Sequence, residues 1–178
     1  MIMAPRWRKF TLATHVATSV GLLGGVASFL LLAVVGVTSS DIGLVRATYP
    51  AMALIAWVII LPLALLALVI GLIESLGTKW GLIRHYWVIV KLVLTVIAIA
   101  VLLLQMGTVS YLGHVAASIQ PGGLVEPRTV MVVHSAGGLL VLLLPLALSI
   151  YKPRGRTGWG RATTLRSRRQ PLPPARHQ

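Results

Sequence analysis

Residues 74–91 read ESLGTKWGLIRHYWVIVK, and a long apolar run flanks this stretch on each side. The Gly-Thr-Lys-Trp-Gly segment at residues 77–81 is rich in turn-forming and polar residues, which is typical of a short loop. We interpret the stretch as a tight cytoplasmic hairpin that joins two transmembrane helices. A tight hairpin makes these two helices antiparallel neighbours, and the rest of the chain is organised around it.

The composition is that of a chain whose solvent is mostly lipid. Apolar residues make up 57% of the sequence and charged residues only 11%, whereas an average soluble domain has about 25% charged residues. The absence of Cys excludes disulfides, iron–sulfur clusters and thiol catalysis. The three acids, Asp41, Glu74 and Glu126, lie far apart, and the phosphate-loop, Gly-x-Ser-x-Gly and His-Glu-x-x-His motifs are missing. We therefore expect no catalytic residues.

The apolar runs predict an all-α, polytopic membrane protein, a bundle of four transmembrane helices within residues 1–150. A single span needs about 20 apolar residues. The four predicted helices cover about residues 10–37, 51–73, 86–106 and 130–150. The first run is too long for a signal-peptide core of about 7–15 residues. Residues 38–48 are expected to form a loop, and residues 111–119 form either an interfacial helix or an extension of the third span.

Prolines and small residues predict how these helices bend and pack. Pro62 and Pro145 lie inside apolar runs, where each removes a backbone donor and favours a kink. Pro50 is expected in the first turn of the second helix. Small residues recur on one face of the first helix and favour close packing against another helix; they are Thr14, Thr18, Gly21, Gly25 and Ser28.

The basic residues predict the orientation in the membrane. With Lys91 set aside because it lies inside a span, thirteen Lys or Arg lie near the termini and in the hairpin, against Arg46 and Arg128 on the other side. An excess of Lys and Arg marks the cytoplasmic side, so both termini are expected in the cytoplasm. The tail, residues 151–178, has eight Lys or Arg and no acid. It should be disordered and contact anionic lipid headgroups, and we expect no nucleic-acid partner.

Two ionisable residues, Glu74 and Lys91, lie toward the same ends of adjacent antiparallel helices. Charges inside a span are costly and are therefore candidates for function. We predict a structural ion pair between them that fixes the hairpin. The alternatives are a proton or ion relay, or a lysine that extends to the interface.

Four histidines lie in or near the spans, and a helical bundle can hold haem between two of them. His15 is six residues past Lys9 and His134 six residues past Arg128, so each lies about 9 Å deep from opposite sides at 1.5 Å per residue. They are too far apart for one iron across a core of about 30 Å. The possible pairs are His15 with His85 and His114 with His134, and haem b is the cofactor that either pair could hold. The absence of Cys, and of Met clustered with His, disfavours a copper or other metal site.

The segment SLGTKWGLIRHYWVIVKL, residues 75–92, resembles a signature of small bacterial four-helix integral membrane proteins of unknown function. His134 near the start of the last span and YKPRG at residues 151–155 are similar to the same group. The resemblance implies the fold and an inner-membrane location but no activity. It leads us to expect His where Gln105 stands, and this difference disfavours haem.

The sequence thus favours a non-enzymatic accessory or structural component of the bacterial inner membrane. One alternative is a b-type haem protein of electron transfer, and a second is an oligomeric transporter or channel. Besides the lipid bilayer, the expected partners are further copies of the chain or a larger membrane complex.

Overall fold

The computed structural model describes residues 3–77, 85–119 and 125–151, and the elements in these ranges are all helices. In chain order they are α1 (Pro5–Thr38), α2 (Ile42–Ile55), the π-helical segment η1 (Ala56–Ile60), α3 (Leu61–Gly77), α4 (Tyr86–Val115), the 3-10 turn η2 (Ala116–Ser118) and α5 (Val125–Tyr151). The predicted hairpin turn and the basic tail lie outside the described residues, apart from Tyr151.

Four helical stretches in the described ranges are long and apolar enough to cross a membrane: α1, the continuous α2–η1–α3 helix, α4 with η2, and α5. Many of their large apolar side chains are exposed, as expected where lipid rather than water is the neighbour. The prediction of an all-α bundle of four transmembrane helices is confirmed, and the protein is a multi-pass membrane protein.

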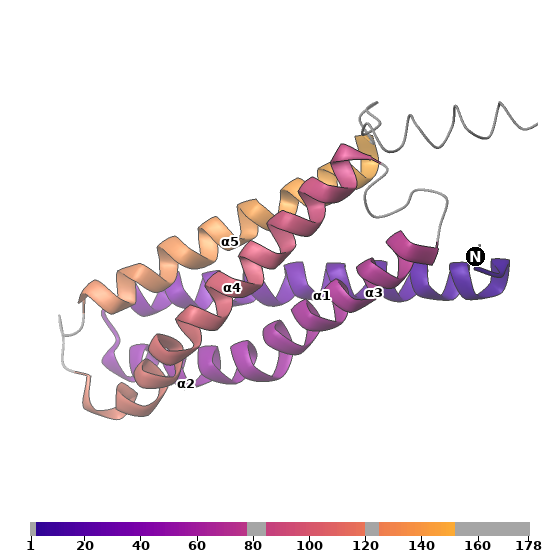
Figure 1. Ribbon diagram of the computed structural model, residues 1–178. Helices are drawn as coiled ribbons and strands as arrows, with labels where there is room; N and C mark the ends of the chain where they lie inside the picture. Colours follow the sequence, from indigo (N-terminus) through magenta and orange to yellow (C-terminus); the bar gives the residue numbers. More distant parts are fainter. Residues whose placement is uncertain (1–2, 78–84, 120–124, 152–178) are drawn as a thin grey trace, which may run out of the picture.

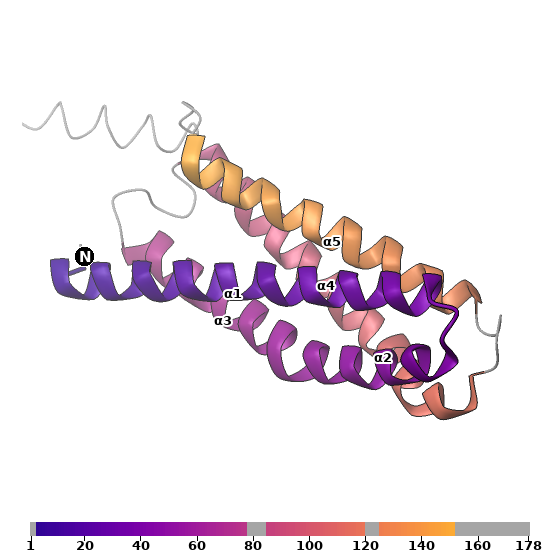
Figure 2. The ribbon, with the colours of Figure 1, turned by 180° about the vertical axis from the view of Figure 1, so that it is seen from behind.

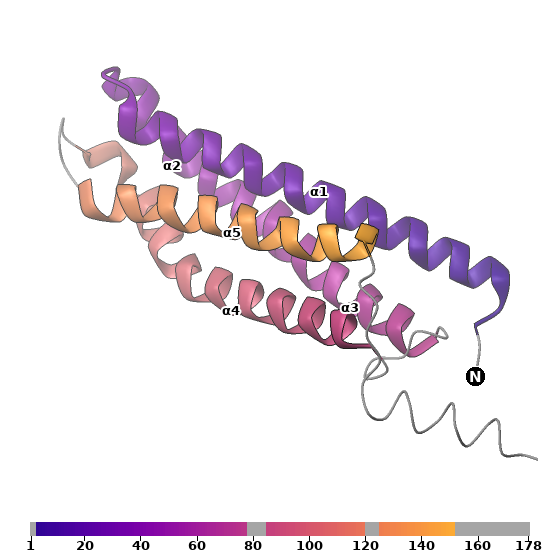
Figure 3. The ribbon, with the colours of Figure 1, turned by 90° about the horizontal axis from the view of Figure 1, so that it is seen from above.

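The helices run antiparallel, so the bundle has two distinct ends (Figure 1). We call the end with the start of α1 and the end of α5 the terminal end, and the opposite one the loop end. α1 packs against α5, α2 and α3, while α4 packs against α2 and α5. Figure 3 shows α1 and α5 lying side by side. In Figure 1 and Figure 2, α4 and α5 diverge together from α1 toward the terminal end.

The second transmembrane helix begins at Ile42 and not near residue 51 as predicted. Asp41 caps it, because its carboxylate accepts hydrogen bonds from the backbone N–H groups of Gly43 at 2.8 Å and Leu44 at 3.2 Å. The loop expected over residues 38–48 therefore shrinks to the three residues between Thr38 and Ile42. Pro50 lies inside α2 and not in its first turn.

Pro62 disturbs the second transmembrane helix, as predicted. Proline cannot donate to the carbonyl four residues earlier, and here the preceding turn widens into the π-helical segment η1, where the Leu61 N–H bonds to the carbonyl of Ala56. π-Helical turns inside α-helices are one recognised cause of bending. The path of the chain changes direction between α2 and α3 (Figure 1).

The small residues of α1 allow close packing against η1 and α3. A Cβ added at Gly21 would lie 3.1 Å from Leu63, and one at Gly25 would lie 3.3 Å from Ile59 and Ile60. The structure confirms the predicted packed face at Thr18, Gly21 and Gly25, whereas Ser28, the last residue of that face, is exposed.

Residues 111–119 extend the third span and do not form a separate interfacial helix. The third span continues without a break to Val115 and ends in the η2 turn. Leu112, Ala116 and Ile119 are buried against the rest of the bundle, so this segment extends the span and packs with it. Pro145 lies inside α5, which starts at Val125.

Candidate functional site

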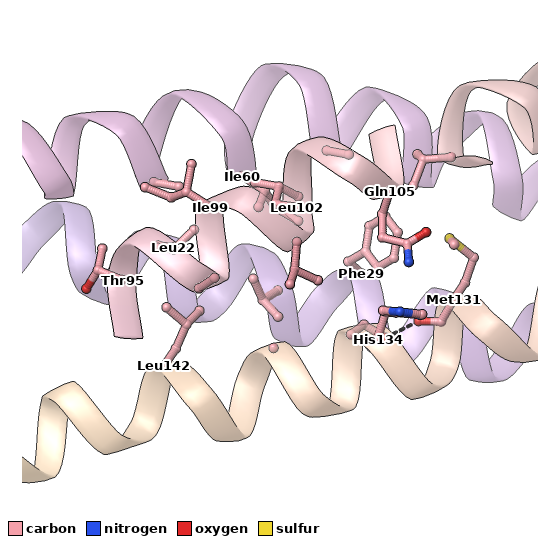
Figure 4. Close-up of a pocket in the computed structure, with 18 residues that line it drawn as sticks. Leu22, Phe29, Ile60, Thr95, Ile99, Leu102, Gln105, Met131, His134 and Leu142 are labelled. Carbon is pink, nitrogen blue, oxygen red and sulfur yellow. Dashed lines mark hydrogen bonds between the residues drawn. The ribbon is translucent and has the colours of Figure 1, made fainter. Parts of the chain in front are cut away.

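A cavity of about 110 Å³ lies inside the bundle, between α1, η1–α3, α4 and α5. Most of its lining is apolar, with Leu22, Phe29, Ile60, Leu102 and Leu142 among the side chains that surround it (Figure 4). Native interiors seldom leave such voids, because each lost contact costs dispersion energy. The cavity is therefore a candidate ligand site.

Four polar side chains line the cavity: Thr95 and Gln105 from α4, and His134 and Ser135 from α5. Two of them are engaged within their own helices. Ser135 donates its hydroxyl hydrogen bond to Met131 O at 2.6 Å, and Thr95 donates to Lys91 O at 2.9 Å. Gln105 and His134 keep hydrogen-bonding capacity that faces the cavity.

The Gln105 carboxamide and the His134 imidazole point toward one another, next to Phe29 and Met131 (Figure 4). Nδ1 of His134 lies 2.9 Å from the carbonyl oxygen of Val130. A carbonyl only accepts, so Nδ1 carries the hydrogen in this bond, and Nε2 of the neutral ring is an acceptor. Gln105 is half-buried and makes no hydrogen bond with the described residues.

The cavity opens sideways between α4 and α5. Val101 and His134 both line it and are both exposed on the surface of the bundle, so they mark a portal toward the lipid. Gly138 also lines it, and a Cβ added there would meet nothing within 4 Å. The neighbouring Gly137 is equally open but does not line the cavity.

The structure does not bring His114 to the cavity. His114 is exposed on α4, while Leu112 and Ala116 on either side of it face the core. Haem between His114 and His134 stays a prediction, but a cavity of this size suits one six-membered ring better than a porphyrin. No group of three or more His, Cys, Asp or Glu within residues 3–77, 85–119 and 125–151 is placed to hold a metal ion.

The other predicted histidine pair, His15 and His85, stays a prediction. His15 lies against α3, where a Cβ on Gly71 would be 3.2 Å from its ring, and its Nδ1 is buried without a hydrogen-bond partner among the described residues. His85 precedes α4, with its ring centroid 6.4 Å from that of Trp87.

Glu74 lies near the end of α3 and Lys91 near the start of α4, so both lie toward the terminal end. Lys91 also reaches another helix, since its Nζ donates to Ser149 Oγ of α5 at 2.7 Å. It also lies 5.6 Å from the centre of the Trp87 ring. The direct Glu74–Lys91 ion pair stays a prediction.

Sequence reasoning missed the polar network at the loop end, where Arg46 and Arg128 were treated only as charges of the loop side. Arg128 is buried, and its Nε donates to the Tyr49 hydroxyl at 2.8 Å while Nη2 donates to the carbonyl of Gly36. Arg46 donates through Nε and Nη2 to the carbonyl of Ile119. The signal available in the sequence was an arginine just inside an apolar run, but nothing pointed to its partners.

The chain matches none of the protein-family models, curated proteins or solved structures with which it was compared.

Proposed function

We propose that this protein is a non-enzymatic accessory component of a bacterial inner membrane that holds a lipid-soluble molecule inside its four-helix bundle. The cavity beside Gln105 and His134 carries the proposal. It is apolar enough for a molecule that partitions into lipid, it opens toward lipid between α4 and α5, and it presents two polar groups with hydrogen-bonding capacity. Binding sites for small molecules commonly combine an apolar lining with a few placed polar groups.

A binding role fits the chemistry better than catalysis. The polar groups that line the cavity are one imidazole, one amide and two hydroxyls, and both hydroxyls are engaged by their own helices. In the described part of the chain, no carboxylate or lysine lines it to complete an acid–base pair with His134. The cavity therefore supports holding a molecule in a defined orientation, as an accessory subunit would.

The test uses the two adjacent glycines of α5. Gly138→Leu places a side chain into open space in the cavity, whereas Gly137→Leu places the same side chain outside it. Both changes remove a helical glycine, which gains about 1 kcal/mol of helix propensity, so neither should unfold the protein. Small lipophiles that co-purify with each full-length variant are extracted and identified by mass spectrometry.

We expect one lipophile distinct from bulk phospholipid to be retained by the wild type and by Gly137→Leu, and to be lost from Gly138→Leu. Equal content in all three preparations would overturn the proposal.

The proposed orientation, with both termini in the cytoplasm, is supported by the distribution of Lys and Arg. It predicts that reporters fused at residues 80 and 178 read inside and those at 43 and 120 read outside.

A further inference from the structure

We infer that the cavity takes a single-ring lipophile bearing a hydroxyl or carbonyl oxygen, the chemistry of a benzoquinone or its quinol, with His134 and Gln105 binding the ring oxygen. The inference rests on the proposed function and adds the ligand class to it. It concerns binding alone.

The size of the cavity sets the first condition. Its volume is about 110 Å³, and an engineered apolar cavity of roughly 150 Å³ holds one benzene molecule. A single six-membered ring therefore matches the space, while a fused tetracycle or a porphyrin does not. Any longer chain on the ring has to leave the cavity, and the portal beside Val101 opens to the bilayer.

The two polar groups set the second condition. Gln105 and His134 face each other in a largely apolar cavity (Figure 4). A hydroxyl on the ring can donate to Nε2 of neutral His134 and accept from the Gln105 amide. A carbonyl can accept from the same amide, and from Nε2–H when the imidazole is protonated. The pair thus has partners for both the reduced and the oxidised headgroup.

Charge sets the third condition, because it excludes other lipids. Among the residues that the structure describes, no lysine, arginine or acid lines the cavity. Lys91 and Arg128 lie on the helices that form the cavity but donate to other side chains, Lys91 to Ser149 and Arg128 to Tyr49. A carboxylate or phosphate headgroup would enter a site with no cation to offset its desolvation, and this is expensive at low dielectric. A neutral oxygen headgroup has no such cost.

The position of His134 is the fourth argument. An ionisable side chain on the lipid-exposed part of a span is costly and marks a functional site by default. His134 is exposed, and the half-buried Gln105 next to it makes no hydrogen bond with the described residues. A ligand oxygen between them supplies the missing partner.

The experiment measures binding to the full-length protein in detergent by isothermal titration calorimetry. The probes are a decyl-substituted benzoquinone, its quinol, and decylbenzene, which has the same tail and ring but no oxygen. The variants are His134→Phe and Gln105→Leu, which remove the hydrogen-bonding groups but keep a side chain of similar size. His114→Phe is the matched histidine control. Far-ultraviolet circular dichroism checks that each variant is folded, and His134→Leu replaces His134→Phe if the latter is not.

We expect the quinone and quinol to bind the wild type, with about tenfold weaker binding for each cavity variant, equivalent to about 1.4 kcal/mol per lost hydrogen bond. Decylbenzene should bind more weakly and respond to neither change, and His114→Phe should match the wild type. The quinone inference fails if all three probes bind equally well and neither His134→Phe nor Gln105→Leu weakens their binding. The lipophile site still stands in that case if Gly138→Leu, which fills the cavity, abolishes the binding of all three probes. If Gly138→Leu leaves binding of every probe unchanged, both fail.

Discussion

Replacing Tyr49 by Phe tests the hydrogen bond that joins α2 to α5 at the loop end. The change removes only the hydroxyl that accepts from Arg128 Nε at 2.8 Å. Tyr49 is 1% exposed and Arg128 7%, so water cannot readily replace the lost partner. The guanidinium keeps its bond to the Gly36 carbonyl, and the bundle should therefore fold but be less stable.

Two magnitudes bear on the size of the effect. Interhelical hydrogen bonds in membrane proteins average about 0.6 kcal/mol and reach about 1.7 kcal/mol. Buried hydrogen bonds to a charged group contribute about 1.5–3 kcal/mol. Because Arg128 is charged and almost fully buried, we expect Tyr49→Phe to cost about 1.5–3 kcal/mol of unfolding free energy.

The assay is unfolding of the full chain by SDS in mixed micelles, followed by circular dichroism. Tyr111→Phe is the matched control, because Tyr111 is 52% exposed and loses a hydroxyl with no described partner; it should change stability by less than about 0.5 kcal/mol. In an Arg128→Met background Tyr49→Phe should cost little, since the charged donor is already gone. Equal effects of the two Tyr→Phe changes, or full additivity with Arg128→Met, would refute the reasoning.

Three further predictions concern the other helices and the haem alternative. Gly25→Leu should lower the unfolding free energy by about 1–3 kcal/mol through overpacking against η1. Gly24→Leu is the control and should not lower it, because a Cβ at Gly24 meets nothing within 4 Å. SDS unfolding of both variants measures the difference. Glu74→Gln and Lys91→Met should each destabilise and the double variant should recover part of the loss; strict additivity would mean that the charges do not interact. A haem protein would show a Soret band that disappears in His134→Ala, whereas the proposed function expects a wild-type preparation without one.

Much of the fold could be read from one-dimensional features of the chain. Apolar runs longer than about 20 residues can satisfy their backbone in lipid only as helices, so the four spans follow from composition. Pro62 removes a backbone N–H donor whatever the helix packs against, so a distortion of the helix there was predictable. The spacing of Gly21 and Gly25 predicted a close contact with another helix, which the structure shows. Helix limits were less predictable, because α2 starts at the Asp41 cap and not where the apolar run begins.

The candidate site depended on the tertiary structure. Counting residues along a helix gives the depth of a side chain, and by depth His114 and His134 formed a reasonable pair. Depth says nothing about rotation around the helix axis, which packing determines: α4 turns His114 outward and Gln105 inward. Arg128 and Tyr49 are 79 residues apart, and no local pattern relates them. Contacts between helices depend on how all four faces fit at once, so only the packed bundle could place Gln105 opposite His134.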